Sequence, residues 1–144
     1  MGLQDKLKNF MSDKLNAEKQ AGIAFMEENG KREGVKQLDN GIQYEVLKEG
    51  SGTKPHANSV IKAHYRGCLT NGTEFDSSYK RNDPFTAPLT ALIKGWQEVV
   101  PMMNEGSAWR LWIPSHLAYG DRGTGGIPGG ATLQFDIELL EVKS

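Results

Sequence analysis

The feature that most constrains the fold is an alternation of apolar and polar residues with a period of two. It recurs in three separate segments, residues 61–69, 109–113 and 133–139. Successive side chains of a β-strand point to opposite faces, so this pattern predicts strands that bury one face. A weaker alternation over 42–47 predicts a further strand of the same kind.

Shorter signals connect these strands. Asn71-Gly72 follows the segment 61–69 and predicts a hairpin turn, because both residues tolerate positive φ, with a short strand returning over 74–76. A further extended piece is expected around Pro84-Phe85. Apolar residues from Leu89 to Val100 fall on helical spacing, and Pro101 is expected to end that helix. Four to six antiparallel strands around one short helix predict an α+β half-barrel.

The N-terminal part has a different pattern. Residues 3–29 contain no proline and are rich in good helix formers, and Asn29-Gly30 follows as a stop signal. We therefore divide the chain into a helix and linker, residues 1–34, and a second domain, residues 35–144, that begins with a polar connector. The helix carries an apolar stripe that either packs on a second copy to make a homodimer or packs on its own domain. The stripe comprises Leu3, Leu7, Met11 and Leu15.

Charge and composition exclude several functions. The chain has seventeen Lys and Arg and eighteen Asp and Glu, with no stripe of basic residues, which argues against nucleic-acid binding. Without a stretch of about twenty apolar residues the chain is expected to be soluble and not embedded in a membrane. It is expected in the cytoplasm as written, or in the periplasm if a signal peptide was removed. Three separated histidines and the single Cys68 predict no metal site, and no cofactor is expected.

Familiar catalytic motifs do not account for the sequence. No Gly-x-Ser-x-Gly motif is present, which argues against covalent hydrolysis. The glycine-rich run 123–130 lacks the Gly-Lys-Ser/Thr ending of a phosphate-binding loop and precedes a strand. Aromatic and aliphatic residues instead gather near turns. Each of them alone is more often a core residue than a site residue, although together with Asp76 they could line a pocket. They are Tyr65, Phe75, Phe85, Ile93, Trp96, Tyr119, Ile127 and Phe135.

Residues 63–69 followed by 71–78 resemble the signature block of FKBP-type peptidyl-prolyl isomerases. Residues 93–96 and 113–120 resemble the pocket-floor helix and the next strand and loop of that family. Residues 127–128 and 131–140 resemble its last loop and strand. The blocks keep the family order over residues 41–142. Residues 25–29, 34–35 and 41–44 further resemble bacterial members related to the macrophage infectivity potentiator, in which a longer helical N-terminal region often makes a dimer.

The resemblance implies an FKBP-like antiparallel twisted half-barrel wrapped around a short helix, preceded by a helical extension. It also implies isomerisation of Xaa-Pro bonds in proline-containing polypeptides, a role in protein folding, and binding of macrolide inhibitors. It assigns catalytic roles to Phe75, Asp76, Ile93, Trp96 and Tyr119, and substrate binding to Tyr65, Arg81, Phe85, Leu92, Ile127 and Phe135. The chain departs from the family at Gly126 and Gly129, where a large apolar residue and a proline are common, so we expect a looser loop over the pocket.

These residues suit the chemistry that the resemblance implies. Rotation about a peptide bond costs about 18–20 kcal/mol because resonance stiffens it, and an apolar pocket favours the twisted, less polar amide. Trp96 would form the floor, Tyr119 an orienting hydroxyl, and the Ile93 N–H a donor to a substrate carbonyl. Asp76 either orients the substrate or serves the architecture through Tyr65 and Arg81. The alternative function is a binding or chaperone module with weak or no turnover.

Overall fold

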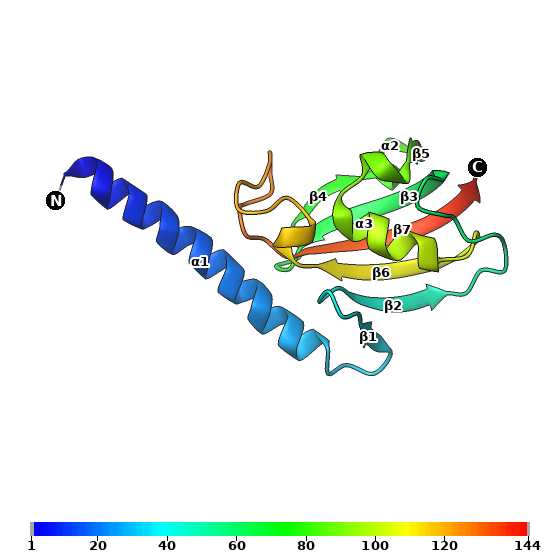
Figure 1. The fold of residues 1–144 in the computed structure, drawn as a ribbon, viewed down its shortest axis with the longest axis horizontal. Helices are drawn as coiled ribbons and strands as arrows, with labels where there is room; N and C mark the ends of the chain where they lie inside the picture. The colour runs from blue at the N-terminus through cyan, green and yellow to red at the C-terminus, as the bar shows by residue number, and fades with distance from the viewer. Residues whose placement is uncertain (1, 144) are drawn as a thin grey trace.

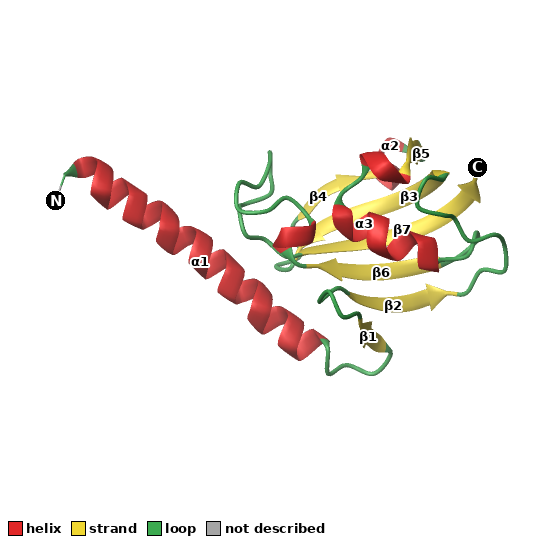
Figure 2. Cartoon of the chain, viewed as in Figure 1, coloured by secondary structure: helices red, strands yellow, loops and turns green. Residues whose placement is uncertain are grey.

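The computed structural model describes residues 2–143, in which one long helix precedes a curved antiparallel sheet that carries a short helix on one face (Figures 1 and 2). The predicted α+β fold is therefore confirmed. The helices are α1 (Leu3–Asn29), α2 (Ser78–Arg81) and α3 (Lys94–Val99). The strands are β1 (Val35–Gln37), β2 (Gln43–Lys48), β3 (Val60–Leu69), β4 (Glu74–Ser77), β5 (Phe85–Pro88), β6 (Ala108–Ile113) and β7 (Leu133–Val142).

Strand β3 organises the sheet. The order is β1-β2-β6-β7-β3-β4, all neighbours are antiparallel, and β5 also pairs with β3. One edge of β3 pairs with β7 from Ile61 to Leu69. The other edge is divided, because β5 pairs with residues 60–63 and β4 with residues 66–68. Residues 64 and 65 thus lie between two partner strands.

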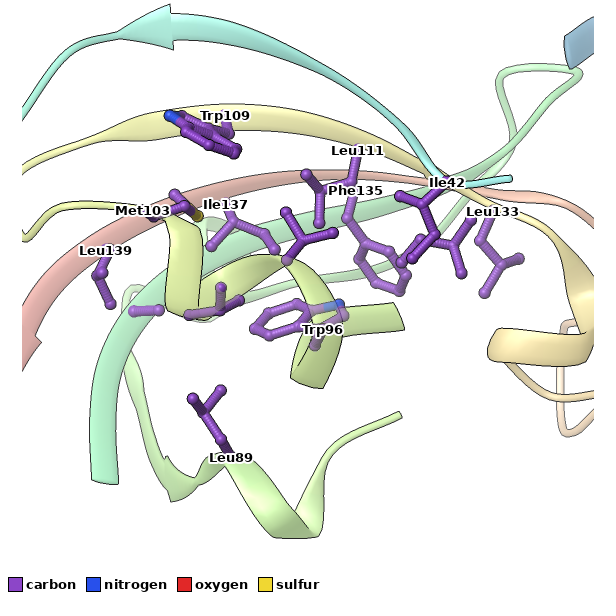
Figure 3. Packing of buried hydrophobic residues seen from close by; sticks show 14 of the residues in the cluster. Ile42, Leu89, Trp96, Met103, Trp109, Leu111, Leu133, Phe135, Ile137 and Leu139 are labelled. Carbon is purple, nitrogen blue, oxygen red and sulfur yellow. The ribbon is translucent and has the colours of Figure 1, made fainter. Parts of the chain in front are cut away.

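The core lies between the sheet and α3 (Figure 3). The predicted alternation is confirmed: Leu111, Leu133 and Leu139 are fully buried, and Ile137 is 1% exposed. Helix α3 contributes Trp96 and Val99 from the opposite side. Each such side chain contributes about 1.5–3 kcal/mol by leaving water, so this layer holds α3 on the sheet.

The helix predicted over residues 89–100 is wrong in its length. Residues Leu89–Ala91 and Val100–Met102 form separate 3₁₀ turns, and only Lys94–Val99 is α-helical. Leu92 and Ile93 have extended backbones, with ψ of 166° and 154°, which interrupts the helical path. Pro101 lies in the second 3₁₀ turn, after the end of α3.

Three other local features differ from expectation. The polar connector contains strand β1, which pairs with β2 through Val35 and Glu45. In the turn after β3 only Gly72 takes positive φ, while the Asn71 side chain accepts the Thr73 N–H at 2.9 Å. The segment after β4 forms the short helix α2, which the sequence did not predict.

Helix α1 was predicted with the correct bounds, and its two halves have different surroundings (Figure 1). Its first turns are exposed, whereas Gly22 and Asn29 are buried against the domain. A Cβ at residue 22 would overlap the Thr132 hydroxyl, so glycine permits this close approach. The Asn29 side chain donates to Gln43 Oε1 at 2.8 Å. No helix among residues 2–143 has the length and apolarity needed to cross a membrane.

The end of the sheet nearest α1 is buried on both faces, although one buried face was predicted. Trp112 points away from the main core yet is 1% exposed. The Arg32 guanidinium lies over the Trp112 ring at 5.3 Å from the centroid, and the Trp112 indole N–H donates to Gln134 Oε1 at 2.9 Å. The helix and its linker therefore cover part of the outer face.

Candidate active site

A pocket of about 260 Å³ opens between β3, β4, β5 and α3. It brings together nine of the eleven residues that the sequence predicted for the site. Ala91, which was not predicted, also lines the pocket and comes from the 3₁₀ turn before α3. The lining residues are Tyr65, Phe75, Asp76, Phe85, Ala91, Leu92, Ile93, Trp96, Tyr119 and Phe135.

Trp96 is the centre of the aromatic cluster. Its ring makes edge-to-face contacts with Tyr65, Phe85 and Phe135, at centroid distances of 5.6, 5.6 and 5.5 Å. Edge-to-face geometry is favourable for aromatic rings, so the three neighbours hold the indole in one orientation. The indole is 4% exposed, and its N–H has no hydrogen-bond acceptor within residues 2–143.

Two glycines allow these rings to approach closely. A Cβ at Gly95 would lie 2.5 Å from the Ile113 side chain, so α3 packs tightly on β6. A Cβ at Gly67 would lie 2.6 Å from the Phe75 ring and 2.9 Å from the Phe135 ring. These two phenyl groups consequently meet edge-to-face at 5.7 Å on one side of the pocket.

The polar side of the pocket is a triangle of Tyr65, Asp76 and Arg81. Both the Tyr65 hydroxyl and Arg81 Nη1 donate to the Asp76 carboxylate, and Arg81 Nη2 donates to the Tyr65 hydroxyl oxygen at 3.1 Å. Burial alone would raise the pKa of Asp76, but the bonds from Tyr65 and Arg81 outweigh it and lower that pKa. Burial, then the Asp76 carboxylate, raises the pKa of the Tyr65 phenol. Asp76 is therefore an anion and Tyr65 a neutral phenol near neutral pH.

Arg81 does not line the pocket. It lies beside it, with the guanidinium 5.8 Å from the centroid of the Tyr65 ring. Its bonds to the Tyr65 hydroxyl and Asp76 raise its pKa further, so it carries a positive charge throughout the usual pH range.

The extended residues before α3 expose a main-chain donor. The Leu92 carbonyl accepts the Gln97 side-chain amide at 2.7 Å, which fixes this segment. The next amide, the Ile93 N–H, has no acceptor in the part of the chain that the structure describes. It lies in a residue that lines the pocket, so it is available to a substrate carbonyl.

Tyr119 reaches the pocket from the loop between β6 and β7 and is 39% exposed. Gly130 N–H donates to the Gly120 carbonyl at 2.9 Å, which closes the base of this loop next to Tyr119. Ile127, predicted to contact substrate, does not line the pocket. It is 6% exposed and packs in the hydrophobic core, because the loop folds its side chain inward.

A second, larger hollow of about 500 Å³ lies between α1 and the domain. Its lining includes Ile23, Met26, Pro114 and His116 but no Phe, Tyr or Trp. We assign the candidate active site to the smaller of these two pockets, because it combines an aromatic enclosure with fixed polar groups, which is the usual composition of a ligand site.

The fold and this pocket define an α+β half-barrel with an aromatic cavity over its short helix, and known proteins are similar to it in sequence and fold. Residues 51–140 match the family described as FKBP-type peptidyl-prolyl cis-trans isomerase. Residues 1–46 match the family described as the domain amino terminal to FKBP-type peptidyl-prolyl isomerase. The first match covers more than half of the chain, and the protein belongs to the FKBP-type peptidyl-prolyl cis-trans isomerase family.

Individual relatives agree with this assignment. The FKBP-type peptidyl-prolyl cis-trans isomerase FkpA of Aeromonas hydrophila is 48% identical over 122 residues, which are 85% of this chain and 46% of that protein. The peptidyl-prolyl cis-trans isomerase Mip of Coxiella burnetii is 46% identical over 129 residues, 89% of this chain and 55% of that protein. The chain thus spans about half the length of these relatives.

Solved structures share the fold. The crystal structure of FkpA from Escherichia coli has a TM-score of 0.92 at 36% identity, covering 97% of this chain and 66% of that chain. A peptidyl-prolyl cis-trans isomerase from Pseudomonas syringae has a TM-score of 0.84 at 38% identity, covering 90% of this chain and 96% of that chain.

Proposed function

We propose that this chain catalyses cis/trans isomerisation of peptide bonds that precede proline. The observation that carries the proposal is the cavity over Trp96, in which five further aromatic rings and the Asp76 carboxylate line a space of about 260 Å³. Family membership makes the same reaction the first to test. The substrates proposed are proline-containing segments of polypeptides.

The pocket lowers the rotational barrier by replacing water around the amide. A planar amide is polar and strongly hydrated, whereas a half-rotated one has lost its resonance and has a less polar carbonyl. An apolar cavity therefore binds the twisted form better than the planar form, which is the condition for catalysis. The proline ring would lie on Trp96, between Tyr65, Phe85 and Phe135.

Polar groups at the rim would hold the substrate during rotation. The Ile93 N–H can donate to a substrate carbonyl, and Tyr119, a partly exposed residue of the pocket lining, would offer its hydroxyl. Asp76 already accepts bonds from Tyr65 and Arg81, so its carboxylate is fixed before substrate enters. This supports an orienting role for Asp76 and, equally, an architectural one. In either case no proton is transferred and no covalent bond is formed or broken.

A protease-coupled peptide assay tests the proposal. With an Ala-Leu-Pro-Phe type substrate we expect isomerisation well above the uncatalysed rate, which corresponds to tens to hundreds of seconds. Trp96→Ala and Asp76→Ala should each lower turnover markedly. Cys68→Ser should leave it intact, because this buried thiol does not line the pocket.

The same assay separates the enzyme from the alternative, a binding or chaperone module of the same fold. Isomerisation at the background rate, together with prevention of aggregation of an unfolded protein, would establish the module and reject the enzyme. Equal activity in all three variants would instead refute the assignment of the site.

We also propose that the pocket binds macrolides, with an affinity that depends on the loop after Tyr119. Gly126 has positive φ and no atom within 4 Å of where a Cβ would stand, and it replaces a large apolar side chain of the family. We expect a macrolide to bind the pocket with reduced affinity. Titration of the protein with a macrolide, followed by tryptophan fluorescence, should detect this binding. Asparagine tolerates positive φ better than other non-glycine residues, but it is polar, so Gly126→Asn should not raise the affinity for the macrolide.

Helix α1 supports the proposal of a homodimer. Its first turns expose four large apolar side chains, with exposed fractions of 57–83%. Monomers rarely leave such a group of apolar residues in water, and a second α1 could cover it. Sedimentation at two concentrations should show a dimer that Leu7→Glu disrupts and Lys8→Glu leaves intact; a monomer at both concentrations would reject it. The exposed side chains are Leu3, Leu7, Phe10 and Met11.

A further inference from the structure

The divided edge of β3 leaves Tyr65 without a main-chain partner on that side. Strand β5 pairs as far as Ala63, and β4 pairs from Arg66 onward. The side chain of Ser78 fills this gap. Its hydroxyl oxygen accepts the Tyr65 N–H at 2.7 Å and lies 3.2 Å from the Tyr65 carbonyl oxygen. The Ser78 hydroxyl thus provides the hydrogen bonds to the Tyr65 backbone that a neighbouring strand provides elsewhere in the sheet.

Ser78 is fully buried, and all of its hydrogen-bonding capacity has partners. Besides Tyr65, the hydroxyl lies 2.8 Å from His64 Nδ1. When Nδ1 carries no proton, the hydroxyl donates to it; when Nδ1 is protonated, the ring donates and the hydroxyl turns to the Tyr65 carbonyl. His64 is held in place by stacking on Tyr79 at 4.6 Å. The Ser78 hydroxyl proton therefore has an acceptor in both tautomers.

Ser78 also begins helix α2, and this helix carries Arg81 at its other end. A helix of four residues has no freedom to move one end while the other is fixed, so the position of Ser78 sets that of Arg81. Arg81 in turn bonds the Tyr65 hydroxyl and Asp76. Tyr65 is consequently held from the same short segment at its backbone by Ser78 and at its hydroxyl by Arg81.

We propose that Ser78 is a positioning residue of the isomerase site, which fixes the Tyr65–Asp76–Arg81 triangle by replacing the missing strand partner of Tyr65. This inference rests on the proposed function for its kinetic consequence, but its structural part does not. Ser78 does not itself line the pocket; it is hydrogen-bonded to the lining residue Tyr65, and it acts through that residue and through Arg81.

The test compares Ser78→Ala with a matched control, Ser107→Ala. Ser107 is another buried serine, whose hydroxyl accepts the Gly50 N–H at 2.9 Å away from the pocket. Both variants lose a bond to a backbone amide, and Ser78→Ala also loses the hydroxyl's contact with His64 or the Tyr65 carbonyl, so both should lose thermal stability and Ser78→Ala somewhat more. Only Ser78→Ala should lower kcat/KM, by about tenfold, the effect of one lost buried hydrogen bond. If Ser78→Ala does not fold, Ser78→Cys replaces it in the test, because cysteine is close to serine in size and its thiol forms weaker hydrogen bonds.

Two further readouts distinguish positioning from general loss of stability. In wild-type protein the carboxyl of Asp76 should titrate below its ordinary range by NMR, and in Ser78→Ala its pKa should rise, because Arg81 is no longer held against it. In the double variant Ser78→Ala/Arg81→Ala the loss of kcat/KM should be smaller than the two single losses combined, since Ser78 acts in part through Arg81.

Several results would overturn the inference. One is an equal loss of kcat/KM in the Ser78 and Ser107 variants, and another is full activity in Ser78→Ala. A third is lost activity with an unchanged Asp76 pKa, since Arg81 would then still be in place. If the wild-type protein itself shows no isomerase activity, the proposed function fails, and the Asp76 titration alone still decides whether Ser78 positions the triangle.

Discussion

Substituting Gly67 by alanine should narrow the pocket without straining the backbone. Gly67 lies in β3 and does not have positive φ, so alanine is compatible with its conformation. The added methyl, however, would stand 2.6 Å from the Phe75 ring, whereas ordinary van der Waals contact begins near 3.4 Å. The phenyl group must therefore move by about 0.8 Å. Phe135 on the other side would stand 2.9 Å from the methyl and must also give way.

The size of the effect follows from what these two rings do. Overpacking of this kind costs about 1–3 kcal/mol of stability, which leaves a domain of ordinary stability folded. Misplacement of groups that position substrate by about 1 Å can cost on the order of a hundredfold in rate. We expect kcat/KM for an Xaa-Pro peptide to fall by at least about tenfold in Gly67→Ala, through displaced pocket walls.

A peptide isomerisation assay with a parallel thermal unfolding curve measures both quantities. Gly125→Ala is the control, because a Cβ at Gly125 meets no atom within 4 Å and that residue does not have positive φ. It should keep wild-type activity. A folded Gly67→Ala protein with the kcat/KM of the wild type would refute the claim that Phe75 and Phe135 form the catalytic pocket.

Two further predictions concern charge and the N-terminal helix. The pKa of Asp76 is lower in the folded protein than its ordinary value of 3.8, so the carboxylate stabilises the fold above that value and this contribution is lost as the pH falls through the lowered pKa. In Asp76→Asn the free energy of unfolding should therefore fall less steeply than in the wild type as the pH drops below about 4. An unchanged acid unfolding profile would contradict the bonds from Tyr65 and Arg81 to Asp76. Gly22→Val should loosen α1 from the domain, measured by faster amide exchange near Thr132, while Ala24→Val on the exposed side should not. Equal exchange in both would show that close approach at Gly22 is unimportant.

The strands and the core were predictable because each β-strand repeats its pattern every two residues. Residues such as Ile137 and Leu139 alternate with Asp136 and Glu138, and the sheet buries the apolar set more deeply than the charged one. Strand β1 was missed, since Val35 is the one apolar residue in its three positions and pairing with β2 provides the rest. The helix over residues 89–100 was too long, because spacing alone does not reveal the extended backbones of Leu92 and Ile93.

The site was predictable to a comparable degree. The aromatic residues converge because β3, β4, β5, α3 and β7 each contribute lining residues to the same cavity. The resemblance to the family indicated which aromatic residues these are. Ile127 was misplaced, because the path of a glycine-rich loop decides whether its side chain faces substrate or core. Ala91 was missed for want of any local signal. Ser78 was not singled out either, because its role depends on the gap between β4 and β5, which no spacing shows.

In the proposed mechanism an apolar, aromatic cavity accelerates rotation about an Xaa-Pro bond with no proton transfer and no covalent intermediate. Exchange NMR on a proline peptide with catalytic amounts of the protein, in light and in heavy water, tests this mechanism directly. We expect a cis/trans exchange rate that rises in proportion to protein concentration and is the same in both solvents. Exchange at the uncatalysed rate, or catalysis that is clearly slower in heavy water, would contradict it.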